Sequence, residues 1–147
     1  FLSQALILEG EYRQAGRYLE QALRFVPSDP TLLNNLAWLR HEQGRDGAEN
    51  LARRALQLAP NSPQIADTLG WILVQEGDVA NGLALLREAA RLAAEDPNIR
   101  YHLAYALHAD GDHAAASEML RALLADHRGD FLRRSEAEAL LANLEGG

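Results

Sequence analysis

The sequence contains neither cysteine nor lysine among its 147 residues. Without cysteine, the chain has no disulfide, no thiolate nucleophile and no cysteine-ligated metal site, and its redox compartment is undecided. All 14 basic residues are arginine, so every site that depends on a lysine is excluded as well.

Long apolar runs and an excess of positive charge are also missing. No stretch reaches the roughly 18 uninterrupted apolar residues of a membrane-spanning helix, so we expect no transmembrane segment. The 14 basic and 21 acidic residues give a net charge of -7, which opposes attraction to phosphate groups. We therefore expect no nucleic-acid partner. The hydrophobic content of 48% is sufficient for one packed domain.

No motif in the sequence points to catalysis. A Gly-x-Gly-x-x-Gly loop and a Walker pattern are both absent. None of the serines is spaced with a histidine and a carboxylate as in a catalytic triad. We therefore expect the chain not to be an enzyme and to carry no cofactor. The serines are Ser3, Ser28, Ser62, Ser117 and Ser135.

The histidines do not have the spacing of a metal site. His102 and His108 are six residues apart, whereas two ligands on one helical face are expected four apart. Neither His113 nor His127 can be placed on a common face with them from the sequence. We therefore expect no bound metal ion.

What the sequence does contain is an internal repeat. A proline followed by an amphipathic segment with an aromatic residue recurs at 30–38, 63–71 and 97–105, at offsets of 33 and 34 residues. Each segment leads to a glycine turn and a second amphipathic run. Because glycine ends helices and a polar neighbour can start the next one, each unit is predicted to be helix, turn, helix. The turns are Gly44-Arg45-Asp46, Gly77-Asp78 and Gly111-Asp112, with Gly10-Glu11 in a first, partial copy.

These units resemble the tetratricopeptide repeat family, whose pattern is about 34 residues long. Its Leu-small pair matches Leu2-Ser3, Leu36-Ala37, Leu69-Gly70 and Leu103-Ala104, and its small residue early in the second helix matches Ala15, Ala48, Gly82 and Ala116. Small residues there let paired helices approach closely. The chain departs from the pattern where Ala94 and Arg128 replace the closing proline found at Pro27 and Pro60. The resemblance implies an all-α fold, a right-handed α-solenoid of stacked helix-turn-helix repeats.

The register divides residues 1–147 into a single repeat array. Residues 1–29 form a truncated repeat, 30–62, 63–96 and 97–129 form three complete repeats, and 130–147 form a C-terminal capping helix. The predicted helices span 1–9, 12–25, 31–43, 47–59, 63–76, 79–93, 97–110, 113–126 and 134–145. Because the first copy starts inside a helix, we expect a fragment of a longer protein with more repeats before Phe1.

The last helix is predicted to cover the open end of the solenoid. Ser135 and Glu138 have the order of a capping box, and apolar residues recur at 137, 140, 141 and 144. A terminal repeat needs such a cover because its exposed stacking face is an apolar patch.

The register also identifies the residues that line the concave face. Four columns result: Asn34, Asp67 and Tyr101; Asn35, Thr68 and His102; Trp38, Trp71 and Tyr105; and His41, Val74 and His108. Apart from Val74, these residues are the candidate partner-binding site.

Two interpretations of the aromatic column are open. Trp38, Trp71 and Tyr105 offer large rigid surfaces that could stack a peptide side chain or a sugar ring. Alternatively, the tryptophans pack between successive helices as part of the core.

The polar columns leave a similar choice. Asparagine, aspartate and threonine contribute little to helix stability, which favours contact with a partner. Solvation in an empty groove and hydrogen bonds between repeats are the alternatives. His102, beside Tyr101 and Tyr105, offers pH-sensitive binding, because the ordinary pKa of histidine is about 6.5.

The resemblance also bears on the partner. The best-known peptide-binding mode of the family, a clamp of lysines and asparagines for a carboxyl terminus, is unavailable without lysine. An asparagine ladder like that of O-linked sugar transferases stops after Asn34 and Asn35, at Thr68 and His102.

Segments 34–38, 67–73, 101–104 and 131–141 are similar to the C-terminal repeats of bacterial proteins of exopolysaccharide production and PEP-CTERM/exosortase surface sorting. This resemblance implies a non-enzymatic protein-protein interaction scaffold in the cell envelope or periplasm, whose groove binds a peptide or helix during export or assembly. The alternatives are a carbohydrate-contacting module that stacks polysaccharide on the groove aromatics, and a cytoplasmic adaptor.

Overall fold

The computed structural model describes residues 2–146, with side chains from residue 9 onward. Within this range the chain forms eight α-helices and no strand, as expected for an all-α fold. The predicted ends of α2 to α7 are correct to within one residue. The helices are α1 (Leu2–Phe25), α2 (Pro30–Glu42), α3 (Ala48–Leu58), α4 (Pro63–Gln75), α5 (Val79–Leu92), α6 (Pro97–Ala109), α7 (His113–Asp126) and α8 (Arg134–Gly146).

The first helix of each complete hairpin starts with a proline placed after a capping side chain. Asp29 caps α2, Ser62 caps α4 and Asp96 caps α6, each by accepting a backbone N–H of the first turn. Proline suits the first helical position because the N–H that it lacks would have no partner there. These local signals explain why the sequence predicted the starts of these helices.

The turns inside the hairpins depend on glycine in the left-handed region. Gly77 and Gly111 have φ of 97° and 93°, and Asp78 and Asp112 then cap α5 and α7. The turn between α2 and α3 differs because it has left-handed glycines at Gly44 and Gly47, and Gly47 caps α3 without a side chain.

The predicted turn at Gly10-Glu11 is wrong, because α1 runs without a break from Leu2 to Phe25. At the turns before α5 and α7 an aspartate follows the glycine and caps the next helix, whereas glutamate is a poor N-cap residue. Without a cap to start a second helix, Gly10 continues the first one. The predicted Leu2-Ser3 pair lies outside the residues whose side chains are described.

Two glycines let α4 and α5 approach closely where they cross. A Cβ atom added at Gly82 would lie 2.7 Å from the carbonyl oxygen of Gly70 and 2.6 Å from Cγ2 of Val74. Only glycine fits at such a crossing, which confirms that the small residues predicted at Gly70 and Gly82 set the helix separation.

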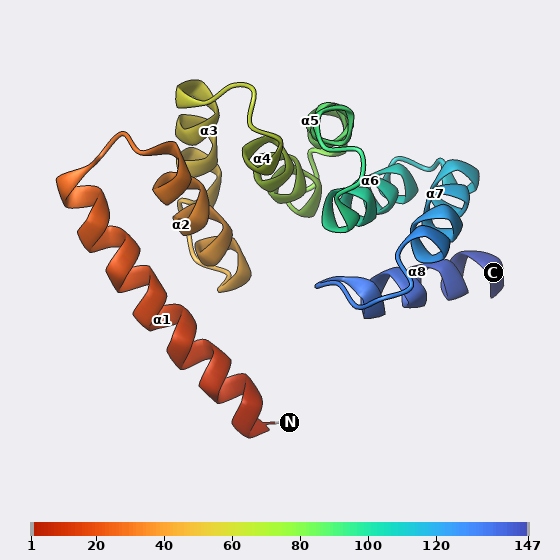
Figure 1. Ribbon diagram of the computed structural model, residues 1–147, viewed down its shortest axis with the longest axis horizontal. Coiled ribbons are helices and arrows are strands. Elements are labelled where there is room, and N and C mark those ends of the chain that lie inside the picture. Colours follow the sequence, from red (N-terminus) through yellow and green to blue (C-terminus); the bar gives the residue numbers. More distant parts are fainter. Residues whose placement is uncertain (1, 147) are drawn as a thin grey trace.

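The hairpins form an arc, with α2, α4 and α6 on its inner side and α3 and α5 on its outer side (Figure 1). The inner helices also contact one another in sequence order, α2 with α4 and α4 with α6. We call the inner surface of these three helices the groove. None of the helices in residues 2–146 combines the length and hydropathy needed to cross a membrane.

The last helix packs against α7, as predicted, and also lies on the inner side of the arc (Figure 1). Its apolar stripe, Ala137, Leu140, Leu141 and Leu144, joins a cluster with residues of α4, α6 and α7. The predicted capping box does not form, because α8 begins at Arg134 and places Ser135 inside the first turn. Arg134 instead donates to the carbonyl oxygens of His127 and Gly129 and pairs with Glu138.

Candidate functional site

Residues of the first three predicted columns meet in one pocket of the groove, which we call the groove pocket; Tyr101 of the first column does not line it. Its volume is about 430 Å³, within the range of sites for small ligands or single side chains. Six of the eleven candidate residues line it: Asn34, Asn35, Trp38, Asp67, Thr68 and His102. The other lining residues are Ala15, Leu19, Leu39, Gln64, Asp96, Asn98, Ile99 and Leu132.

A buried hydrogen bond organises this pocket across two repeats. Nδ1 of His102 lies 2.7 Å from Oδ1 of Asp67, and the imidazole ring stacks on Trp71 with ring centroids 4.3 Å apart. Only 2% of the His102 surface is exposed. Because a carboxylate can only accept, Nδ1 carries the hydrogen, and Nε2 is an acceptor in the neutral form of the ring.

Not every polar residue of the columns is free for a partner. Oγ1 of Thr68 donates to the carbonyl oxygen of Gln64 at 2.9 Å, one turn earlier in the same helix. Asn34 is half-buried and Asn35 is exposed, so both remain available in the groove.

The aromatic column is largely covered rather than open. Trp71 is 6% exposed, and it packs with Tyr101, Leu120 and Leu123, with Phe131 and α8 against the same cluster. Burial, reinforced by the nearby Glu136 carboxylate and opposed by Arg133, raises the pKa of Tyr101 to about 12. Trp71 is therefore part of the core, whereas Trp38 and Tyr105 are half-buried.

Arg133 covers the two tryptophans from the groove side. Its guanidinium lies 5.5 Å from the ring centroid of Trp38 and 5.7 Å from that of Trp71. It also donates to Glu42 of α2 at 2.8 Å. The sequence analysis missed this contact because nothing local indicates that residue 133 returns to the second helix. The only indication in the sequence that this segment packs on the protein is the apolar pair Phe131 and Leu132 just before Arg133.

The fourth column does not reach the groove pocket. His41 is half-buried and its pKa is lowered by burial, with Glu42 opposing and Arg133 reinforcing the shift. Val74 belongs to the core. Nδ1 of His108 lies 2.8 Å from Nδ1 of His113 across the α6–α7 turn, a contact that the sequence analysis could not place. Among the residues searched, no group of three or more histidine or carboxylate side chains could hold a metal ion.

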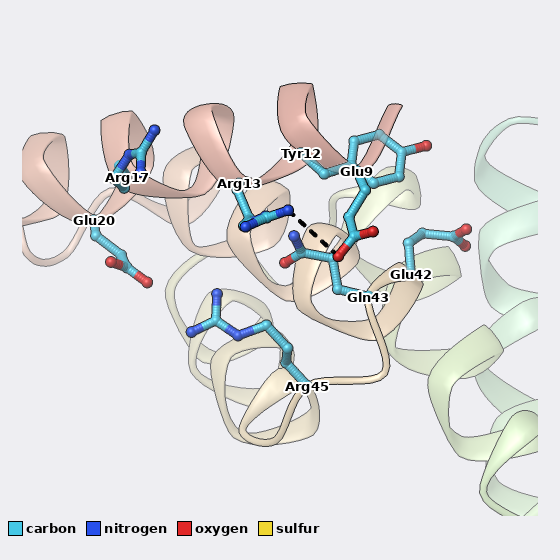
Figure 2. A pocket seen from close by; sticks show the side chains of 8 residues that line it. All are labelled: Glu9, Tyr12, Arg13, Arg17, Glu20, Glu42, Gln43 and Arg45. Carbon is cyan, nitrogen blue, oxygen red and sulfur yellow. Dashed lines mark ion pairs between the residues drawn. The ribbon is translucent and has the colours of Figure 1, made fainter. Parts of the chain in front are cut away.

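A second pocket, of about 750 Å³, lies between α1 and α2 (Figure 2). Its lining carries arginines and glutamates in equal number, and Arg13 pairs with Glu9 at 3.6 Å. Mixed charges give it no preference for a charged ligand. Its lining residues are Glu9, Tyr12, Arg13, Arg17, Glu20, Glu42, Gln43 and Arg45.

Comparison with known proteins agrees with this architecture. Two family models, both described as tetratricopeptide repeat, match residues 2–63 and 73–144. MamA from Desulfovibrio magneticus RS-1 superposes with a TM-score of 0.76 at 20% identity, over 99% of this chain and 80% of that one. PilF from Pseudomonas aeruginosa superposes with a TM-score of 0.77 at 20% identity, over 97% and 64% of the two chains.

An O-GlcNAc transferase from Thermobaculum terrenum is also similar, with a TM-score of 0.73 at 28% identity. The match covers 80% of this chain and 23% of the transferase. A sequence search of curated proteins finds no match. The likeness to MamA and PilF establishes the fold.

Proposed function

Since the chain belongs to the tetratricopeptide repeat family, we propose that it is a non-enzymatic scaffold whose groove holds a peptide or helix of a partner protein. The observation that carries the proposal is the groove pocket, a concave site of about 430 Å³ built from all three complete repeats together with residues of α1 and Leu132. It combines an apolar wall with a few polar groups, the usual composition of a recognition site.

Stacking of polysaccharide has weaker support than peptide binding. A sugar ring needs an open aromatic face, whereas Trp71 and Tyr101 are buried and the guanidinium of Arg133 lies over Trp38. Backbone and side-chain groups of a peptide can instead use the polar rim around Asn35 and Asp67.

We also propose that the scaffold works in the bacterial cell envelope, in the export or assembly of exopolysaccharide or surface proteins. The support is the similarity of segments 34–38, 67–73, 101–104 and 131–141 to repeats of such systems. Fractionation of the full-length protein should place it with the envelope. Recovery of all of it in the cytoplasmic fraction would contradict this assignment and favour an adaptor there.

Site-directed photo-crosslinking tests peptide binding in the groove. A photo-reactive amino acid at Asn35, an exposed groove position, should crosslink to a partner polypeptide in cells that express the full-length protein. The same amino acid at Glu88, an exposed position on α5, serves as the matched control. Equal crosslinking at both positions, or adducts with oligosaccharide only, would contradict the proposal.

A further inference from the structure

The groove pocket is lined by acidic and hydrogen-bond-accepting groups. Asp67 and Asp96 contribute carboxylates, and none of the arginines in the described part of the chain lines the pocket. Each of these carboxylates uses Oδ1 locally: Asp67 toward His102, and Asp96 as the cap of α6. A second oxygen remains on each. The pocket therefore favours a positively charged ligand.

Three side chains of the pocket keep a buried polar atom without a hydrogen-bond partner among residues 9–146. These atoms are Oδ1 of Asn34, Oδ1 of Asn98 and Nε2 of His102. Buried polar atoms in proteins are nearly always paired, so three unpaired ones on residues that line one pocket indicate a ligand. The two amide oxygens are acceptors, and so is Nε2 in the neutral form of the imidazole, which calls for a ligand with several N–H donors.

The chain itself shows how the neighbouring part of the groove holds a guanidinium. Arg133 lies over Trp38, which also lines the groove pocket, and bonds to Glu42. Its neighbour Leu132 lines the pocket with 71% of its surface exposed, so it offers an apolar edge next to the acceptors.

We propose that the groove pocket binds the guanidinium of an arginine in an extended segment of the partner protein; this rests on the proposed function. Arginine presents five donors in a planar fork, which suits two carboxylates, two amide oxygens and an imidazole nitrogen around one cavity. The partner residue next to that arginine packs on Leu132.

Other ligand classes fit this lining poorly. Phosphate or carboxylate groups would meet Asp67 and Asp96 without a basic side chain to receive them. A lysine side chain carries the charge but offers three donors from a single point, so it reaches fewer of the acceptors.

Fluorescence anisotropy with end-blocked peptides tests the proposal on the whole chain. The probe is a labelled Gly-Ala-Leu-Arg-Ala-Gly peptide, and the comparison peptides replace its arginine with lysine, citrulline or glutamate. We expect about tenfold weaker binding for citrulline, which keeps the shape and loses the charge, and no binding for glutamate. The lysine peptide should fall between arginine and citrulline.

Charge variants of the pocket provide the second arm. Asp67→Asn keeps an acceptor for His102 and removes the charge. It should lower the affinity for the arginine peptide about tenfold and leave the melting temperature of the protein unchanged. Asp110→Asn removes an exposed carboxylate just beyond α6 and should leave the affinity unchanged. Arginine and citrulline peptides that bind equally, or Asp67→Asn and Asp110→Asn proteins that behave alike, would overturn the inference.

Failure of the inference is distinguishable from failure of the proposed function. Groove crosslinking at Asn35 to a partner that lacks arginine at the crosslinked segment leaves the scaffold intact and overturns the arginine pocket. Absence of groove crosslinking overturns the scaffold itself. Self-association that Asp67→Asn abolishes, seen by sedimentation velocity, would assign the pocket to a second copy and also overturn the inference.

Discussion

The hydrogen bond between Asp67 and His102 holds these two side chains of the groove pocket in place. It joins α4 to α6 at 2.7 Å, and the stacked Trp71 closes one face of the imidazole. The bond therefore stabilises the stacking of two repeats and also orients the acceptors of the pocket. A substitution here affects both properties, and the chemistry of the replacement separates them.

Asp67→Ala should lower the free energy of unfolding by about 1–3 kcal/mol, because the buried Nδ1–H of His102 loses its acceptor. Asp67→Asn should cost much less, since its amide oxygen accepts the same hydrogen. Urea denaturation followed by circular dichroism measures both. Equal losses for the two variants would show that the hydrogen bond does not hold the ring.

Arg133→Ala should lower stability by about 1–2 kcal/mol, because it removes a cation–π contact and a partly buried ion pair. It should also expose the ring of Trp38, and acrylamide should then quench tryptophan fluorescence more strongly. Arg128→Ala, an exposed position in the preceding loop, is the matched control. Unchanged quenching in Arg133→Ala would argue against the contact.

Tyr101 should make stability fall at alkaline pH. Burial raises its pKa from an ordinary value near 10 to about 12. Its contribution is complete below pH 10 and is lost as the pH rises through 12, because the unfolded chain ionises first. Unfolding measured from pH 9 to 12 should therefore show a steeper decline in the parent than in Tyr101→Phe. Identical declines would contradict the assignment.

The sequence placed Asn34, Asp67 and His102 on one face because the repeat register alone determines which helical positions share a column. It left open whether Trp71 is buried, and it did not predict that Arg133 contacts Trp38, Trp71 and Glu42. Both depend on the segment that follows α7, whose return to the arc is a contact between distant parts of the chain.

Helices and turns were predictable where their ends carry local signals. Proline after a capping aspartate or serine located α2, α4 and α6, and Gly-Asp located α5 and α7. At Gly10-Glu11 the glycine was present without a capping residue, and the helix continued. Glycine indicates a turn in this chain where a capping aspartate follows it, as before α5 and α7, or where a second left-handed glycine does, as at Gly44 and Gly47.

Gly82→Ala and Gly10→Ala should have opposite effects. Inside a helix, alanine is more favourable than glycine by up to about 1 kcal/mol. Nothing lies within 4 Å of a Cβ added at Gly10, so Gly10→Ala should stabilise the chain. At Gly82 the new Cβ meets backbone atoms of Gly70 and Val74 at 2.7 and 2.9 Å, so Gly82→Ala should destabilise it by about 1–3 kcal/mol. Thermal unfolding measures both, and a stabilised Gly82→Ala would show that α4 and α5 separate easily.

The whole molecule is an arc with its last helix folded onto its inner side (Figure 1). Repeat stacking accounts for α2 to α7, because each hairpin contacts its neighbours. The position of α8 is set instead by the apolar cluster it completes with Trp71, Tyr101 and Leu123.

Removal of residues 130–147 should lower the melting temperature and cause concentration-dependent association. The truncation uncovers apolar surface at Trp71, Tyr101, Leu120 and Leu123, and exposed apolar patches promote association. Removal of 145–147 alone should have little effect, since it deletes only the exposed pair of Glu145 with Arg121. Sedimentation velocity measures the association, and a monomeric truncated chain would contradict the role given to α8.

The hydrogen bond from Arg133 to Glu42 connects residues 91 positions apart. A solenoid built from contacts between neighbouring repeats is elastic, because small rotations at each interface add up to a large change in curvature. The hydrogen bond joins α2 to the segment just before α8, and so it restrains the curvature of the arc at two distant points. Loss of this bond should let the arc bend more easily. A partner that displaces Arg133 would then occupy the groove and leave the arc less stiff.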